Sequence, residues 1–237
     1  MDTQTRHALK QDSFVQATTS GIGWLQNNRS RVIAVTVAIV VILAVLFGGL
    51  FFAQSRGAAA QVALGEAMDI YDTPLRPAGQ PADPIQPSFA SSAERAKAAN
   101  PKFVDAANRF GWLRAGKTAR YFAGLTYLDL GQNSSAESNL KQVADSSDAA
   151  LAALAKMTLA GLYHQTGRDP QAIEIYKQII AKPTLTVPAS AAKLQLAQLY
   201  ETSNPTEARR LYAEIKDQDK TTAAAQIAAQ KLNPQPK

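Results

Sequence analysis

The sequence has no cysteine, and only two histidines and two tryptophans among its 237 residues. Without cysteine there are neither disulfide bonds nor thiolate metal ligands. The two histidines, His7 and His164, stand far apart, and acidic residues do not cluster at catalytic or metal-ligand spacings. A phosphate-binding glycine loop and a nucleophile motif are also missing. We therefore expect no enzyme activity, no catalytic residue, no cofactor and no metal, and a domain that is stabilised by packing alone.

A basic patch is missing as well, although the net charge is +6 and the pI is about 9.5. Residues 1–56 carry five cations and two anions, and residues 57–237 carry twenty and seventeen, without runs of one sign. Proteins that bind nucleic acid instead gather lysine and arginine on one face. We expect no nucleic-acid partner.

One long apolar run is present, from Val32 to Ala53, with no charged residue in it. Arg29 and Arg31 precede it, and Arg56 follows it. As a helix with a rise of 1.5 Å per residue it would reach roughly 33 Å, which matches the hydrocarbon thickness of a bilayer. The sequence predicts a single transmembrane helix over residues 32–53.

The charges around this run predict its orientation. The tail of residues 1–31 has four cations and two anions, whereas the twenty residues after the run have one cation and three anions. By the positive-inside rule the tail stays in the cytoplasm and the large domain is translocated. Two alternatives remain open. A signal peptide could be cleaved near residues 57–60, although the run is long and late for one, and a buried core helix would need a fold to cover every face.

The tail itself allows two interpretations. Apolar residues are spaced in a way that is loosely compatible with an amphipathic helix on the inner leaflet: Phe14, Val15, Ile22, Trp24 and Leu25. Gly21 and Gly23 weaken a helix there, so a disordered tail is equally compatible.

Two helices separated by a proline-rich loop follow the apolar run, over residues 54–113. Residues 58–71 have apolar side chains at helical spacing, which predicts a helix that continues from the span. Five prolines then fall within fourteen residues, so residues 73–90 should form an extended or mobile loop. Pro101 suits the first turn of the next helix. Together these helices would form a degenerate first hairpin with the loop inserted in it.

Internal repetition decides the fold of residues 114–220. Three tyrosines are separated by 36 and 37 residues and follow similar small-then-large contexts, AGLTY, LAGLY and LAQLY: Tyr127, Tyr163 and Tyr200. Three alanines are separated by 36 residues each: Ala136, Ala172 and Ala208. Between tyrosine and alanine lies a turn with Gly131, Gly167 or Asn204-Pro205. Each unit is therefore predicted to be helix, turn, helix, and the fold class to be all-α.

This pattern resembles the tetratricopeptide (TPR) repeat, in which a small residue packs helix A against helix B. An aromatic follows three positions later, and an alanine opens the tight part of helix B. The small residues here are Gly124, Ala160 and Ala197. The units exceed the family's usual length of about 34 residues, and Arg120 and Lys156 replace an aromatic early in helix A. The resemblance implies a divergent TPR-like helical-hairpin solenoid, closed by a capping helix within residues 221–237.

The order of parts is similar to that of the YfgM-type ancillary subunit of the SecYEG translocon. The shared parts are a short tail with Leu-Lys-Gln-Asp at residues 9–12, an Asn-Arg pair at the membrane, one span and divergent TPR repeats. The resemblance implies a bacterial inner-membrane protein with a cytoplasmic N-terminus and a periplasmic domain. It also implies contacts with translocon subunits, a periplasmic chaperone or emerging chains.

A partner-binding groove is a further implication of the TPR resemblance. Its lining would come from helix A positions around the small-aromatic core: Tyr121, Leu125, Leu128, Met157, His164, Leu194, Gln198 and Glu201. Such a surface is partly apolar, and an extended or helical peptide could lie in it. The alternative is that these residues pack against the cap or the proline-rich loop.

These observations favour a membrane-anchored scaffold that binds proteins and helps protein translocation or chaperone handover. An adaptor for envelope assembly or cell division, which oligomerises through its repeats, is the alternative. A sensor that signals through the cytoplasmic tail is a third interpretation.

Overall fold

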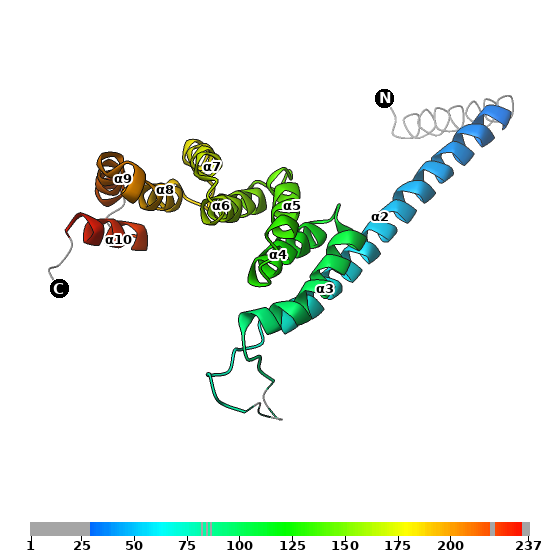
Figure 1. The fold of residues 1–237 in the computed structure, drawn as a ribbon. Coiled ribbons are helices and arrows are strands. Elements are labelled where there is room, and N and C mark those ends of the chain that lie inside the picture. Colours follow the sequence, from blue (N-terminus) through cyan, green and yellow to red (C-terminus); the bar gives the residue numbers. More distant parts are fainter. Residues whose placement is uncertain (1–28, 82, 84, 86, 219–220, 234–237) are drawn as a thin grey trace, which may run out of the picture. The chain divides into compact units, whose positions relative to one another are not determined.

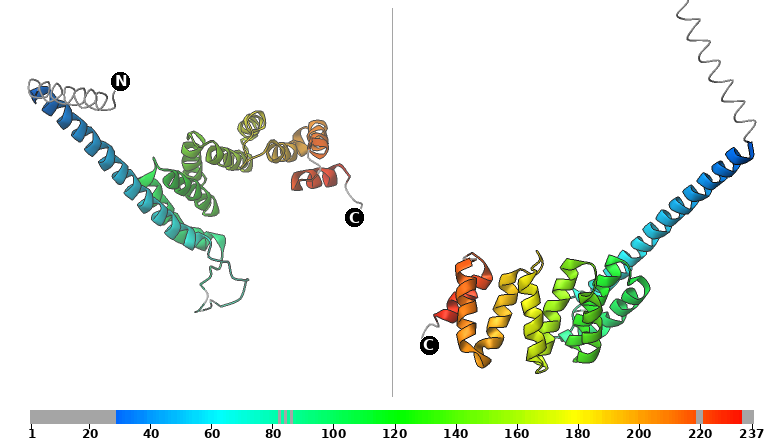
Figure 2. Two further views of the ribbon diagram at one scale, coloured as in Figure 1. Left: turned by 180° about the vertical axis from the view of Figure 1, so that it is seen from behind. Right: turned by 90° about the horizontal axis from the view of Figure 1, so that it is seen from above.

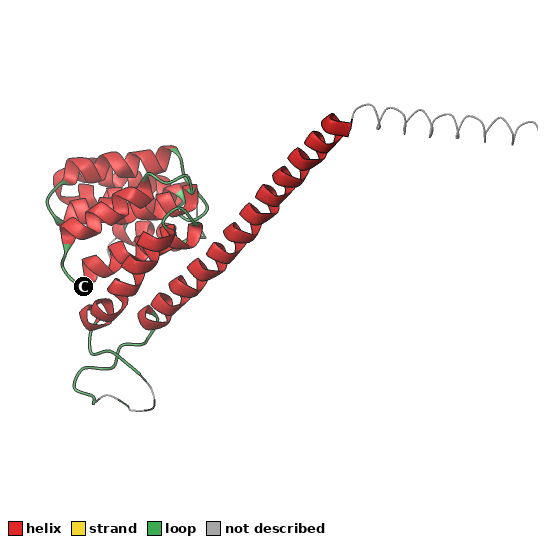
Figure 3. Ribbon diagram, turned by 90° about the vertical axis from the view of Figure 1, so that its right-hand side faces the viewer, coloured by secondary structure: helices red, strands yellow, loops and turns green. Residues whose placement is uncertain are grey.

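The computed structural model describes residues 29–81, 83, 85, 87–218 and 221–233. Within these residues the secondary structure is helical, apart from an isolated bridge between Leu75 and Phe89 (Figure 3). The chain divides into two compact units, residues 1–56 and 57–237. The predicted amphipathic helix of the tail lies outside the described residues.

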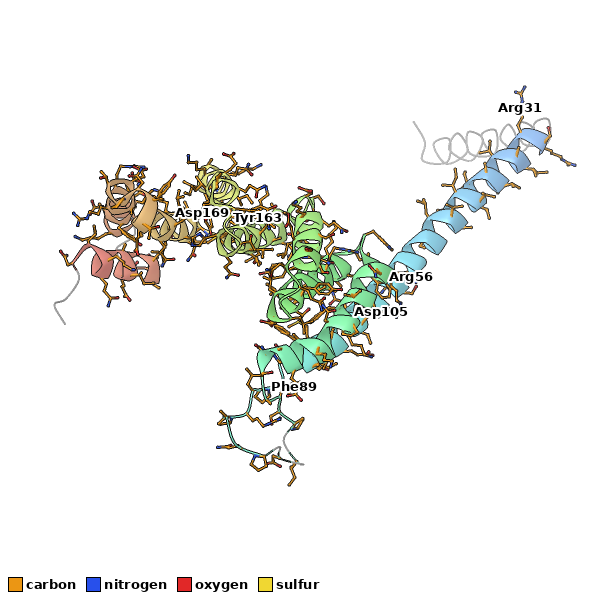
Figure 4. The ribbon with its side chains drawn as sticks, in the orientation of Figure 1. Arg31, Arg56, Phe89, Asp105, Tyr163 and Asp169 are labelled. Carbon is orange, nitrogen blue, oxygen red and sulfur yellow. The ribbon has the colours of Figure 1, made fainter. Side chains whose placement is uncertain are left out.

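The first described helix, α2 (Arg29–Tyr71), is 43 residues long and continues past the apolar run, as the sequence predicted (Figure 1). In the described part of the chain it is the one helix that is long and apolar enough to cross a membrane. Arg31 lies near its start and Arg56 beyond the run (Figure 4). Its large apolar side chains from Ile33 to Phe47 are 45–68% exposed. Contiguous apolar surface of this kind is unfavourable in water.

The second unit begins with a hairpin that joins residues 57–71 of α2 to α3 (Ser92–Phe110). Alanines give the two helices and α4 (Arg114–Asp129) room to approach, and aromatic side chains fill the space beside them. The ring of Tyr71 packs edge-to-face with Phe103 and Phe122, with centroids 5.9 and 5.4 Å away. Phe103 and Phe122 stack at 5.3 Å. This hairpin therefore has its own core, which α4 shares.

The prediction that Pro101 opens a helix is wrong, because α3 begins well before it. Ser91 caps the helix by accepting a hydrogen bond from the backbone N–H of Glu94, at 3.1 Å. Pro101 thus removes a hydrogen bond from the helix interior, at a cost of about 3 kcal/mol. The neighbouring Asn100 is buried and donates to Thr126 Oγ1 on α4 at 2.9 Å, which ties this part of α3 to α4.

The proline-rich loop is paired at its base, although the sequence predicted only an extended or mobile segment. Arg76 N–H donates to the carbonyl of Phe89 at 2.9 Å, and Phe89 N–H donates to the carbonyl of Pro74 at 3.1 Å. The Arg76 guanidinium also donates to the carbonyl of Ser88 at 2.8 Å. These bonds bring the end of α2 to the start of α3.

Three further hairpins stack along the second unit (Figure 2). They are numbered here apart from the α2–α3 hairpin. The first is α4 with α5 (Asn133–Ala144), the second is α6 (Ala149–Gln165) with α7 (Asp169–Ala181), and the third is α8 (Ala189–Ser203) with α9 (Pro205–Gln218). Each helix from α3 to α9 packs against the next one along the chain. The last helix, α10 (Ala223–Leu232), packs against both α9 and α8. Helices α4, α6 and α8 hold the predicted helix A positions, and α5, α7 and α9 the helix B positions.

The small residues of the repeat lie where the two helices of each hairpin come closest. Ala160 and Ala172 in the second hairpin are fully buried, and so are Ala136 in the first and Ala197 in the third. At Gly124 a Cβ atom would lie only 2.8 Å from Cγ of Leu140, which is itself buried. Larger side chains at these positions would force the hairpins open.

We predict that Gly124→Leu destabilises the repeat domain by about 1–3 kcal/mol or more, because the added atoms meet the buried Leu140 side chain. Gly161→Ala is the matched control on α6. Nothing lies within 4 Å of a Cβ at Gly161, so this change should stabilise the helix by about 0.5–1 kcal/mol. Thermal unfolding measures both. Equal melting temperatures for the two variants would contradict the close approach at Gly124.

Candidate protein-binding face

The predicted groove residues fall on three equivalent stripes of the A helices. On α4 they are Tyr121, Leu125 and Leu128, which are four and then three residues apart and share one face. The same register gives Met157, Gly161 and His164 on α6, and Leu194, Gln198 and Glu201 on α8. The sequence-based prediction omitted Gly161, which the register alone would have found.

The first two stripes belong to helices that are in contact with each other. The Tyr121 hydroxyl lies 3.3 Å from Thr158 Oγ1 and so links α4 to α6. Leu125, Leu128 and Met157 are half-buried. Gly161 leaves open space beside α6, since a Cβ at this position would have no neighbour within 4 Å. We define the α4–α6 face as Tyr121, Leu125, Leu128, Met157 and Gly161; it combines apolar contacts with a gap that a partner's backbone could enter.

The third stripe is largely used by the chain itself, which corrects the prediction for Leu194. Leu194 is a core residue with 8% of its surface exposed, so it does not line an open groove. Glu201 accepts hydrogen bonds from Tyr212 of α9 at 2.5 Å and from Lys231 of α10, whose Nζ lies 2.9 Å away. Gln198 is exposed. In this stripe Glu201 therefore contacts the capping helix α10, and Leu194 lies in the core.

His164 serves the turn between α6 and α7. Its Nδ1 lies 2.7 Å from Oδ1 of Asp169, the first residue of α7, and both side chains are about half exposed. Figure 4 labels Asp169 beside Tyr163, the repeat tyrosine of α6. That His164 has no catalytic role stays a prediction.

A charged cluster around Tyr163 joins the first and second hairpins, and the sequence pattern did not indicate it. Glu137 of α5 accepts from Lys141 at 2.7 Å, from Arg168 at 2.8 Å and from the Tyr163 hydroxyl at 3.2 Å. Arg168 lies over the Tyr163 ring, 4.3 Å from its centroid. The hydrogen bond from Lys141, with those from Arg168 and Tyr163, lowers the pKa of the Glu137 carboxyl below 4.5, although burial opposes the shift.

The third hairpin has a related arrangement around Glu201. The hydrogen bonds from Tyr212 and then Lys231 lower the pKa of the Glu201 carboxyl. Burial, followed by the bond to Glu201, raises the pKa of the Tyr212 hydroxyl. At both Glu137 and Glu201, a carboxylate thus accepts a hydrogen bond from a tyrosine on another helix and from a nearby cation.

Metal binding finds no support in the described part of the chain. No group of three or more histidine, aspartate or glutamate side chains is placed there to hold an ion. That the protein needs no cofactor stays a prediction.

Comparison with known proteins identifies the fold. No protein-family model matches the sequence, and no curated protein matches it. Two crystal structures of a Podosopora anserina kinesin light chain-like protein with nearly identical TPR-like repeats are similar to it. Both are 18% identical over 58% of this chain and 76% of theirs, with TM-scores of 0.50 and 0.49. The chain has a TPR-like repeat fold. Membership in the YfgM-type family stays a prediction, because the comparisons address the TPR-like fold alone.

We predict that Glu137→Gln makes the stability of the TPR-like domain less sensitive to acid. A carboxyl whose pKa is lower in the folded state stabilises the fold above its unfolded pKa of 4.5. That contribution is lost as the pH falls through the lower folded pKa. Melting temperatures measured from neutral pH down through this window should therefore fall less for Glu137→Gln than for the parent. An equal fall of the melting temperature with decreasing pH in both proteins would contradict the role of this cluster.

Proposed function

We propose that this protein is a non-enzymatic scaffold that binds other proteins through the α4–α6 face of its TPR-like domain. The observation that carries the proposal is the contrast between the hairpins. In the α8 stripe Leu194 is a core residue and Glu201 is engaged by α9 and α10, whereas the α4 and α6 stripes keep half-buried apolar side chains and the open position at Gly161. Apolar side chains on a face of this kind suit an extended or helical peptide.

A membrane anchor is the second part of the proposal. The exposed apolar side chains from Ile33 to Phe47 would be stabilised by lipid, and arginines flank the run at Arg31 and Arg56. The excess of cations before the run favours a cytoplasmic N-terminus and a periplasmic TPR-like domain in a bacterial inner membrane. The order of tail, span and divergent repeats supports a place at the Sec translocon, where the domain would assist emerging chains or a periplasmic chaperone.

The absence of cysteine provides a direct test of this topology. We predict that a full-length Ser138→Cys variant, with its single thiol on the exposed side of α5, reacts with a membrane-impermeant maleimide. The labelling uses cells whose outer membrane is permeabilised and whose inner membrane is intact. A second variant, Thr3→Cys, tests the tail and should react only after lysis. Reaction of the tail alone before lysis would reverse the proposed orientation.

The partner is tested by photo-crosslinking in cells from the full-length protein. A photo-reactive residue at Leu125 or Met157 should give adducts with translocon subunits, chaperones or emerging chains. The same residue at Lys177, exposed on α7, is the control and should give fewer. Adducts with envelope-assembly proteins, or only with a second copy, would instead favour the structural adaptor. Equal adducts from all three positions would remove the α4–α6 face from the proposal.

We further predict that Leu125→Asp weakens the adducts from Met157 by roughly tenfold, because an apolar contact of about 1.5 kcal/mol or more is lost from the interface. Ser138→Asp on α5 is the control and should leave them unchanged. Far-ultraviolet circular dichroism separates a binding defect from misfolding. Loss of helicity in Leu125→Asp would show that Leu125 serves packing rather than binding.

A further inference from the structure

A pocket lies at one end of the second hairpin and shares no residue with the α4–α6 face. It has a volume of about 530 Å³ and is enclosed by the end of α5, the start of α6 and the end of α7. Its floor is apolar, with Ala152, Ala153 and Ile179. Its polar lining includes two lysines, Lys156 and Lys182.

Neither ammonium group makes an ion pair or a hydrogen bond with any residue that the structure describes. As a residue Lys156 is half-buried, and Lys182 is exposed. Ser146 adds a hydroxyl whose oxygen is buried without a hydrogen-bond partner among the described groups. Two cations and an orphaned hydroxyl at one apolar pocket are suited to an anion that enters from outside.

The other hairpins show what normally satisfies a cation at this place. Arg120, Lys156 and Lys193 occupy the same repeat position, four residues before the small residue of helix A. Arg120 donates to the carbonyl of Ala107 at 3.0 Å. Lys193 lies 3.1 Å from a carboxylate oxygen of Glu214 on α9. Lys156 alone of the three has no partner among the residues that the structure describes.

The missing partner of Lys156 can be located by the repeat register. Ala172 and Ala208 mark the same position of helix B, 36 residues apart. The same offset places Gln178 where the third hairpin has Glu214, and Lys182 where it has Gln218. Gln178 and Lys182 both line the pocket. Compared with the third hairpin, the second therefore has an amide in place of the Glu214 carboxylate and a second cation in place of the Gln218 amide.

We propose that this pocket binds a side-chain carboxylate from an acidic segment of a partner protein, which takes the place that Glu214 fills in the third hairpin. Charge complementarity favours such an occupant because neither lysine is paired within the described chain. The alanine and isoleucine floor favours a carboxylate flanked by apolar side chains over a hydrated nucleic-acid backbone. The proposal rests on the proposed protein-binding function but concerns a second surface of the same domain.

The test uses full-length protein in detergent micelles and three short probe peptides. The first has alternating leucine and glutamate with an amidated end. The second has glutamine in place of glutamate and a free C-terminal carboxylate, and the third is the same glutamine peptide with an amidated end. Calorimetric titration at low salt measures all three. The proposal predicts that the glutamate peptide binds and that the amidated glutamine peptide does not.

Two variants remove the site in different ways. Lys156→Gln removes a cation and should weaken binding of the glutamate peptide about five- to tenfold. Gln178→Glu restores the carboxylate of the third hairpin, so it should block the pocket to a similar extent while leaving the melting temperature equal or higher. Lys177→Gln, outside the pocket on α7, is the control and should bind as the parent does.

Several outcomes would overturn the proposal. Among the peptides, these outcomes are that the glutamate peptide does not bind, that only the free-ended glutamine peptide binds, or that the two amidated peptides bind equally. Among the variants, the outcome is that Lys156→Gln, Gln178→Glu and Lys177→Gln bind the glutamate peptide with equal affinity. The Leu125→Asp variant distinguishes the two surfaces. Peptide binding that survives in Leu125→Asp but is lost in Lys156→Gln assigns it to the pocket. Loss in Leu125→Asp alone assigns the peptide to the α4–α6 face, which would keep the proposed function and remove the pocket.

Discussion

The close approach of paired helices at small residues is the constraint on which the repeat domain depends. Gly124 against Leu140, and the buried alanines at the same positions of the next two hairpins, set how near helix A lies to helix B. Helices this close leave little volume between them, so a few large side chains fill the space between successive hairpins. The stack then brings α4 and α6 into contact, so that stripes of residues far apart in sequence become neighbours.

Different elements close the two ends of the stack. At one end, residues 57–71 of α2 and α3 form a hairpin with an aromatic core around Phe103. At the other end, α10 packs on α8 and α9, and Lys231 reaches Glu201. A repeat array needs such terminal elements because an uncovered hairpin would expose an apolar face. Under the proposed function, the middle of the array binds partners through the α4–α6 face, and the further proposal adds the pocket beside Lys156.

The fold was largely predictable from the sequence because the same small and aromatic residues recur three times at a spacing of 36 or 37 residues. Local signals were less reliable: Pro101 indicated a helix start, but the cap at Ser91 and the buried Asn100 kept it inside α3. The paired base of the proline-rich loop rests on backbone bonds that no side-chain pattern encodes. In the candidate site, Leu194 lies in the core and Glu201 links α8 to α10, and the sequence pattern indicated neither. The other groove residues stay a prediction. Which helix A positions stay open depends on what the chain's own ends cover.

The most direct test is hydrogen exchange of the full-length protein in lipid nanodiscs, measured with and without its crosslinked or copurified partner. The account predicts that the partner slows exchange in α4 and α6, and at the pocket around the start of α6 and the end of α7, while α8 to α10 change little. Slowed exchange confined to α8–α10, or to segments outside the TPR-like domain, would contradict the central claim that the middle of the array is the binding surface.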